Sequence, residues 1–348
     1  MTSYQRFMAA IKGEPVDRVP VFPLLMFFAA SRAGITYKRF ATDGRAMADA
    51  QLSVQKKFGF DAITACSDAF RVSADLGGEM VYPEDAPPFL SKPLVISAGD
   101  ILGLQRPDPS DNKNRMADRA LAVSEMANES SGTVAVLGWV DMPFAEACSV
   151  CGVSNFMTMM VDDPAGAHAL LAFLTKIVID FALVQVEAGA DMVGAGDAAA
   201  SLISPEMYSN FALPYEQEVC AAVHNAGNLI KLHICGNTAR LLPEMVKSGA
   251  DLFNVDHLVP FALARDVYSS CGKCFKGNLN PVSQVMQATP EECAGYVRKC
   301  LVEVEGARFM LSAGCEIPAE TPDEVFQAFC NEPQRFRAQN TVGKINLE

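Results

Sequence analysis

Positive charge is scarce in this sequence. Lysine and arginine together number 28, against 41 aspartates and glutamates, which gives a formal net charge of -13 and an isoelectric point near 4.8. The basic residues form no cluster along the chain. Nucleic acids and anionic membrane surfaces are bound through a basic footprint. We therefore expect neither nucleic acid nor a membrane among the partners.

The sequence also lacks a long apolar run. The stretch 19–30 is too short to span a bilayer, and it contains Pro20 and Pro23. Residues 1–6 lack the charged segment and apolar core that begin a secretory signal. These absences indicate a cytoplasmic protein whose thiols stay reduced. Its 11 cysteines and 16 methionines, both prone to oxidation, suit an anaerobic cell.

No low-complexity tract or long polar linker divides the chain, so we expect one domain over residues 1–348. Short apolar runs alternate with amphipathic stretches, a pattern typical of parallel βα units. Eight strands are predicted at 19–28, 61–67, 133–140, 191–197, 229–235, 252–256, 274–279 and 308–314. Helices are predicted between them, most clearly at 43–58, 113–129, 164–188, 205–226, 238–248, 260–270, 290–305 and 321–330.

Local signals support these units. Asp163-Pro164 and Ser204-Pro205 each place a capping residue before a proline at the first helical position. The sequence Gly-Ala-Asp, at 189–191 and again at 249–251, ends a helix and begins a strand. Eight such units favour a closed (β/α)8 TIM barrel over a doubly wound open sheet. Residues 71–110, rich in proline, are expected to form an irregular excursion with a short hairpin.

Polar residues follow the predicted strands at their carboxyl ends, where barrel enzymes place their active sites. Asp68, Asp197 and Asp256 follow the second, fourth and sixth strands, and they are the candidate catalytic carboxylates. Asn278 lies near the end of the seventh strand. His257 is either a group that supports a bound ligand or an ordinary loop histidine.

A candidate metal site stands out among these residues. Alternate side chains of a strand point to the same face, so His233 and Cys235 converge at the end of the fifth strand. Cys315, in a turn after the eighth strand, would complete a His-Cys-Cys set. Three protein ligands and one open position are typical of catalytic zinc. The plainer alternative is a buried histidine and thiol that only pack together.

Other chemistries receive less support. The chain has no phosphate-binding loop and no hydrolase triad. Cys148-x-x-Cys151 and Cys271-x-x-Cys274 have the spacing of zinc or redox motifs, but neither has a second local pair. We interpret both pairs as structural.

At these motifs the sequence resembles the uroporphyrinogen decarboxylase superfamily, whose fold is a (β/α)8 barrel. The resemblance covers nearly the whole chain and includes the stretches 18–21, 66–68, 138–144, 187–191, 233–237 and 276–280. In the decarboxylases an Arg-Gln-Ala-Gly-Arg motif binds the substrate carboxylates, whereas residues 27–34 here keep only Arg32. Cys315 stands where the decarboxylases have histidine, and Asp68 matches their catalytic aspartate.

The other branch of the superfamily contains the methylcobalamin:coenzyme M methyltransferases and related corrinoid-dependent enzymes of one-carbon metabolism. Their zinc motif matches His233, Cys235 and Cys315 residue by residue. The resemblance implies Zn²⁺ as cofactor and a methyl group moving from methylcobalamin, or another methylated corrinoid, to a thiol such as coenzyme M, or to a folate. Asn278 and His257 are then the candidate cofactor-binding residues, and Glu316 or Asp256 the candidate fourth zinc ligand in the resting state.

The chain lacks an Asp-x-His-x-x-Gly segment that would hold a corrinoid through a histidine, so a separate corrinoid protein is the expected partner. Two alternatives stay open. One is a decarboxylase-like enzyme that acts on a tetrapyrrole without metal, and the other is a non-catalytic module that binds a corrinoid protein.

Overall fold

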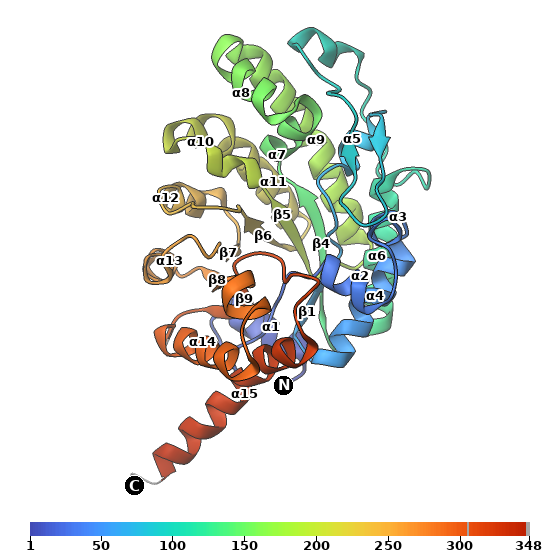
Figure 1. Ribbon diagram of the computed structural model, residues 1–348. Coiled ribbons are helices and arrows are strands. Elements are labelled where there is room, and N and C mark those ends of the chain that lie inside the picture. Colours follow the sequence, from blue (N-terminus) through green and yellow to red (C-terminus); the bar gives the residue numbers. More distant parts are fainter. Residues whose placement is uncertain (305, 346–348) are drawn as a thin grey trace.

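A parallel sheet of seven strands lies at the centre of the computed structural model, which describes residues 1–304 and 306–345, with only the backbone for 338–345. The sheet curls into a half-barrel with helices outside it (Figure 1). The strand order is β1 (Ala62–Thr64), β4 (Ala135–Asp141), β5 (Met192–Gly196), β6 (Leu229–His233), β7 (Leu252–Asn254), β8 (Cys274–Leu279) and β9 (Phe309–Ala313). Every neighbouring pair in it is parallel.

The prediction of seven of these strands is confirmed, but that of a strand over 19–28 is wrong. This segment makes only isolated bridges, Val21 with Leu311 and Leu24 with Glu316, before a helix begins at Phe27. Pro20 and Pro23 carry no backbone N–H, so a continuous hydrogen-bonded ladder cannot form there. The structure therefore shows an α/β half-barrel and leaves a closed eight-stranded barrel unconfirmed.

The helices follow the predicted alternation and cover the outer face of the sheet (Figure 1). The longer ones after β1 are α6 (Arg115–Ser130), α9 (Pro164–Glu187), α11 (Leu213–Asn225), α13 (Phe261–Ser270), α14 (Pro290–Glu303) and α15 (Asp323–Ile345). Ahead of β1 lie α1 (Ser3–Lys12), α2 (Phe27–Arg32), α3 (Tyr37–Thr42) and α4 (Gly44–Phe58). Shorter segments are α7 (Pro143–Cys151), α8 (Val153–Asp162), η2 (Ala198–Leu202), α10 (Pro205–Phe211), α12 (Leu242–Met245), η3 (Val246–Ser248) and η4 (Pro281–Met286).

The predicted caps form, but two predicted helices differ from the observed ones. The helix predicted over 238–248 begins only at Leu242, where α12 is followed directly by η3. The side chains of Asp163 and Ser204 accept hydrogen bonds from backbone N–H groups in the first turns of α9 and α10. The predicted helix over 205–226 is instead α10 and α11, separated at Ala212. Pro214 causes the break, because it cannot donate to the preceding turn and so begins a new helix.

Residues 71–110 contain no strand of the main sheet. They form α5 (Arg71–Asp75), an antiparallel hairpin of β2 (Met80–Val81) with β3 (Phe89–Leu90), and the 3₁₀ helix η1 (Ala98–Gly103).

Among the described residues, one single helix is long and apolar enough to cross a membrane. This helix is α9, and half of its most apolar window is buried inside the protein. It packs against α11, α7 and β4. A buried core helix passes the same test of length and composition, so α9 is weak evidence for a membrane span.

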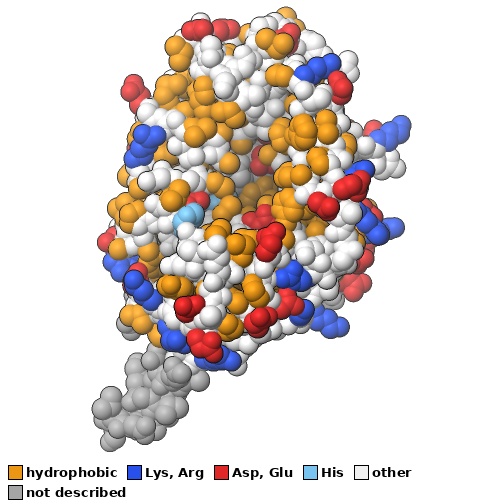
Figure 2. Space-filling view, viewed as in Figure 1, with side chains coloured by type: hydrophobic (Ala, Val, Ile, Leu, Met, Phe, Trp, Pro, Cys, Tyr) orange, Lys and Arg blue, Asp and Glu red, His pale blue; other side chains and the backbone are white. Residues whose placement is uncertain are grey.

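The two ends of the sheet differ. At the amino end, α1 packs across the strands, and Phe7 and Ile11 join a buried cluster with Phe22 and Met310. In Figure 1 this helix lies behind the sheet, so the carboxyl ends of the strands face the viewer. Figure 2 shows a hollow near the middle of that face, with hydrophobic side chains around it and acidic side chains within.

Candidate metal centre

Three metal-binding side chains meet at the carboxyl end of the sheet. His233 is the last residue of β6, Cys235 follows two residues later, and Cys315 follows β9. The His233 Nε2 atom lies 3.0 Å from the Cys235 Sγ, which lies 3.8 Å from the Cys315 Sγ. All three donor atoms lie within 4.8 Å of one another. The structure thus brings together the three residues that the sequence predicted as metal ligands.

The backbone around these residues fixes their directions. The Nδ1 atom of His233 lies 3.3 Å from the carbonyl oxygen of Asn254, to which it donates. A proton on Nδ1 leaves the lone pair of Nε2 free to face Cys235. Gly314 brings the Cys315 turn close to the loop after β7, because a Cβ atom there would lie only 2.3 Å from the backbone nitrogen of His257.

The two cysteine sulfurs lie 3.8 Å apart, within hydrogen-bonding distance of each other. Their mutual hydrogen bond lowers the pKa of Cys315 and raises that of Cys235, and burial opposes the shift at Cys315 while adding to it at Cys235. His233 lowers the pKa of Cys315 further. The lowered pKa of Cys315 favours its thiolate, which is the form that binds a metal ion.

Asp256 holds the metal-site loop, the turn at Gly236 that follows Cys235. Its Oδ2 atom accepts a hydrogen bond of 2.9 Å from the Gly236 N–H, and its Oδ1 atom accepts one of the same length from the Leu258 N–H. His257 places its Nδ1 3.1 Å from the Asp256 Oδ1, and its side chain is 29% exposed. Both oxygens of Asp256 are occupied by the chain itself, so its visible role is to hold the turn after Cys235.

Glu316 has a similar internal role. Its Oε1 atom accepts hydrogen bonds from the Met26 and Phe27 N–H groups, at 2.9 and 2.5 Å, where α2 begins. Burial raises the pKa of its carboxyl group to about 8, against those backbone hydrogen bonds. These contacts join the Cys315 turn to the segment that ends at α2.

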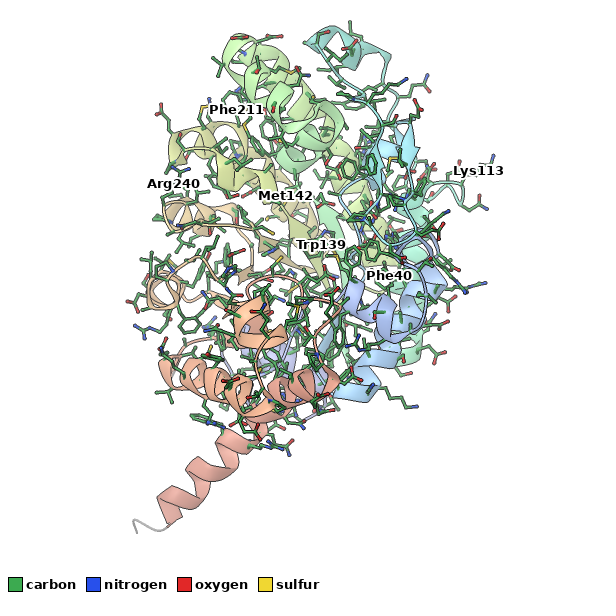
Figure 3. All side chains as sticks on the ribbon, viewed as in Figure 1. Phe40, Lys113, Trp139, Met142, Phe211 and Arg240 are labelled. Carbon is green, nitrogen blue, oxygen red and sulfur yellow. The ribbon has the colours of Figure 1, made fainter. Side chains whose placement is uncertain are left out.

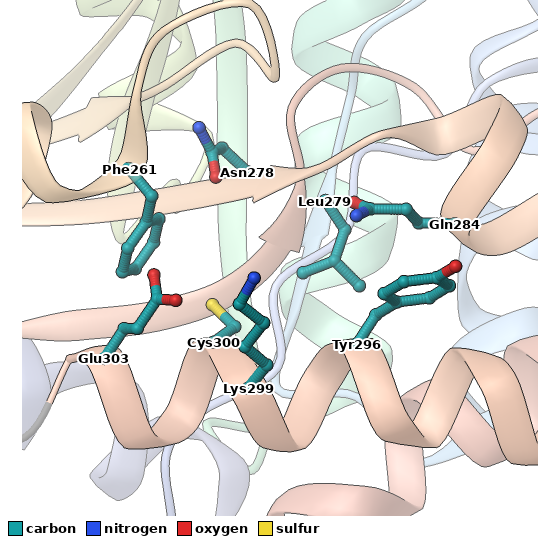
Figure 4. A pocket seen from close by; sticks show the side chains of 8 residues that line it. All are labelled: Phe261, Asn278, Leu279, Gln284, Tyr296, Lys299, Cys300 and Glu303. Carbon is teal, nitrogen blue, oxygen red and sulfur yellow. The ribbon is translucent and has the colours of Figure 1, made fainter.

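Asn278 borders a different pocket. Its Nδ2 atom donates to the carbonyl oxygens of Asp256 and Val259, at 3.2 and 2.7 Å. Figure 4 shows the pocket that it lines between β8 and α14. The contacts of Asn278 are therefore with the loop after β7 and this pocket rather than with the three donor atoms.

Asp197 belongs to a buried acid cluster behind the site. Its carboxyl group lies beside that of Glu216, which accepts a hydrogen bond of 2.5 Å from the Tyr208 hydroxyl. Burial and the neighbouring Glu216 raise the pKa of Asp197 well above its ordinary value. The backbone N–H of Asp197 donates to the His233 carbonyl oxygen at 2.8 Å. Asp197 thus supports the end of β6 through its backbone.

Asp68 is held in an ion-pair network. Arg115 donates to both of its oxygens at 2.9 Å, and Ser67 donates to one of them at 2.6 Å. The Arg119 guanidinium lies 3.9 Å away, and the Asp68 side chain is 0% exposed. Burial would raise the pKa of Asp68, but the charges of Arg115, Arg71 and Arg119 lower it overall.

Sequence reasoning missed two groups of buried cations. Arg115 and Arg119 lie on α6, about 50 positions from Asp68, and only the packing of α6 brings them to it. Lys231 and Lys276 lie on β6 and β8 with their side chains fully buried. Strand alternation places Lys231 on the same face as His233 and Cys235, so this pattern could have identified Lys231 from the sequence.

Comparison with known proteins identifies the family. The family model described as "Uroporphyrinogen decarboxylase (URO-D)" matches residues 2–336, and the chain belongs to this family. Its relatives include both methyltransferases and decarboxylases. A methylated-thiol–coenzyme M methyltransferase of Methanosarcina mazei is 26% identical, over 94% of this chain and 88% of the relative.

Two further relatives, one methyltransferase and one decarboxylase, have nearly the same sequence identity to this chain. The methylcobamide:CoM methyltransferase MtbA of Methanosarcina acetivorans is 28% identical, covering 94% of this chain and 97% of its own. A uroporphyrinogen decarboxylase of Nocardia farcinica is 29% identical, covering 88% of each chain. Overall identity therefore does not separate the two branches, and the residues of the site have to do so.

A solved structure described as a methyltransferase from Methanosarcina mazei shares the fold. It superposes with a TM-score of 0.87 at 22% identity, covering 97% of this chain and 99% of its own. This agreement supports the half-barrel architecture.

Proposed function

We propose that this protein is a zinc-dependent methyltransferase that moves a methyl group from a methylated corrinoid to a thiol. The observation that carries the proposal is the meeting of His233, Cys235 and Cys315 at one point of the carboxyl-end face. The resemblance to methyltransferases of this family adds support.

The donor set suits zinc. One imidazole nitrogen and two thiol sulfurs, all within 4.8 Å of one another, form a soft three-ligand group, which zinc accepts in catalytic sites. When bound, zinc would lower the pKa of an acceptor thiol and hold it as a thiolate. Cys235 and Cys315, as cysteinates, would balance the charge of a bound zinc ion, so an acceptor thiolate bound with them would make the site negative and keep its sulfur rich in electrons.

The residues of the chain prepare this site. The Asn254 carbonyl oxygen holds the His233 ring, and the Asp256 carboxylate holds the Gly236 turn next to Cys235. Such supporting contacts orient metal ligands. Gly314 permits the close approach that carries Cys315 to the other two side chains.

In the proposed reaction, the acceptor sulfur attacks the methyl carbon in line with cobalt. A sulfur–carbon bond forms, the cobalt–carbon bond breaks, and its electron pair stays on cobalt as cob(I)alamin. Positioning the two reactants supplies much of the rate enhancement, about 7–11 kcal/mol in favourable cases.

The corrinoid is expected on a separate protein that docks at the hollow in Figure 2, because the chain lacks a segment that would hold it. We infer a cytoplasmic enzyme with a small thiol, or a folate, as acceptor.

We also infer that residues 20–24 take the place of an eighth strand. The Phe22 N–H donates to the Leu311 carbonyl oxygen at 2.9 Å, and the Asp61 N–H donates to the Val21 carbonyl oxygen at 2.7 Å. The segment thereby contacts β9 on one side and the residue before β1 on the other.

The test is to incubate zinc-loaded protein with methylcobalamin and candidate acceptors and to follow the methyl-cobalt absorption. Loss of that absorption with a thiol, and none without acceptor, is the expected result. Failure with every thiol and folate would contradict the proposal. Consumption of uroporphyrinogen by metal-stripped protein would favour a decarboxylase instead.

A further inference from the structure

A buried lysine lies on the strand that carries His233. Lys231 precedes His233 by two positions on β6, so the two side chains point to the same face of the sheet. Its side chain is 0% exposed. The Nζ atom lies 4.5 Å from the centroid of the Trp139 ring, a side chain labelled in Figure 3, and 5.4 Å from that of Phe22.

Among the described residues, the Lys231 Nζ has no hydrogen-bond acceptor. Burial lowers the pKa of Lys231 to about 8, and the neighbouring thiols of Cys66, Cys315 and Cys235 act against that shift. Lys276, its neighbour in the interior, differs in that its Nζ donates to the Phe22 carbonyl oxygen at 2.8 Å. A buried cation without a partner is costly, so the placement of Lys231 requires an explanation.

Cys66 does not supply the missing negative charge. Its thiol is buried, and burial raises its pKa far above the ordinary value, so it is neutral near pH 7. The aromatic faces of Trp139 and Phe22 stabilise an ammonium group without neutralising it. The charge of Lys231 therefore remains available to the two thiols of the metal site.

We propose that Lys231 is a positioning residue that balances the negative charge of an acceptor thiolate bound at the His233-Cys235-Cys315 centre. This inference rests on the proposed function. The zinc ion and two cysteinates have no net charge, so binding an acceptor as thiolate adds one negative charge to a half-buried site. Lys231 offsets that charge, and it makes the site prefer an anionic sulfur ligand over a neutral ligand.

The experiment uses full-length protein loaded with cobalt(II) in place of zinc, because cobalt reports its ligands by absorption. Two titrations are compared, one with 2-mercaptoethanesulfonate, which binds as thiolate, and one with imidazole, which binds as a neutral ligand. The variant is Lys231→Met, whose side chain is unbranched, apolar and of similar length. The control is Lys273→Met, which removes a lysine bonded to backbone carbonyl oxygens just before β8.

We expect Lys231→Met to take up cobalt as the wild type does. Its affinity for the thiol should fall about tenfold or more, since a desolvated charge pair is lost, while imidazole binds as before. Lys273→Met should change neither titration. Lys231→Gln gives a second neutral variant for the same titrations if the methionine variant does not fold.

Four results would overturn the inference. Unchanged thiol affinity in the Lys231 variants, or an equal loss for imidazole, would remove the charge-balancing role while leaving the metal centre intact. If Cys66→Ala loses as much thiol affinity as Lys231→Met does, the partner of Lys231 is Cys66 and not the acceptor thiolate. A wild-type protein that takes up no cobalt would overturn the proposed function and this inference together.

Discussion

Two polar clusters at the carboxyl end of the sheet differ in how far their groups satisfy one another. Around Asp68, two arginines and Ser67 surround a carboxylate that is 0% exposed, and each Asp68 oxygen accepts at least two hydrogen bonds. Around Cys235, the three donor atoms contact chiefly one another, and both cysteines are partly exposed. The first cluster is complete within the chain, whereas the second leaves lone pairs available for a ligand. Both were candidate sites in the sequence, and only their partners distinguish them.

Removing a sulfur should have the largest effect on activity. In Cys235→Ser or Cys315→Ser we expect zinc content to fall from about one per chain to near zero, because a hydroxyl is a much poorer zinc ligand. Methyl transfer should be lost with it, and the far-ultraviolet circular dichroism should stay unchanged. Metal analysis of the purified variants provides the measurement. Cys148→Ser is the matched control and should keep its zinc.

Removing the charge of Asp68 should instead affect stability. Asp68→Asn leaves Arg115 buried without its counter-ion, which typically costs about 3–5 kcal/mol. Urea denaturation of the variant and the wild type measures this loss of free energy of unfolding. Zinc content should not change. An Asp68→Asn protein of normal stability that no longer transfers methyl groups would reverse the comparison and make Asp68 part of the chemistry.

Asp256 shares features of both clusters. Its carboxylate oxygens accept hydrogen bonds from the chain itself, and one of these bonds holds the turn after Cys235. Asp256→Asn should weaken zinc binding by about 10- to 100-fold, the range seen when a group that orients metal ligands is altered. Competition with a chelator measures the affinity. An unchanged affinity would show that the Gly236 turn holds its shape without the carboxylate.

The smallest expected effect is the pH dependence of the stability that Asp68 contributes. The pKa of Asp68 is lowered in the folded protein, so its ion pairs contribute stability above the unfolded value of about 3.9 and lose it as the pH falls further. The difference in unfolding free energy between wild type and Asp68→Asn should therefore be constant from about pH 7 to 5 and shrink below about pH 4. Urea titrations at several pH values measure it. A difference that stays constant down to pH 3 would argue against an ionised Asp68.

Local patterns predicted what depends on local rules. Strand alternation placed His233 beside Cys235, and the order of βα units placed Cys315 near them. Local patterns did not predict the contacts that depend on residues distant in the sequence. Nothing near Asp197 or Asp256 in sequence shows that Glu216 lies beside the first or that the Gly236 N–H bonds to the second.

The wrong prediction about the fold has the same kind of cause. The apolar run over 19–28 has the composition of a strand, but its two prolines interrupt the hydrogen-bonded ladder. The sequence alone does not single out Lys231, because its significance depends on thiols that other segments of the chain bring close to it.

The most direct test of the central claim is zinc K-edge X-ray absorption of the purified protein, with and without a thiol acceptor. The account predicts two sulfur neighbours, from Cys235 and Cys315, at about 2.3 Å, and a third sulfur at a similar distance when the thiol is added. A sulfur count that does not change on adding thiol, or a zinc ion bound elsewhere without sulfur, would contradict it.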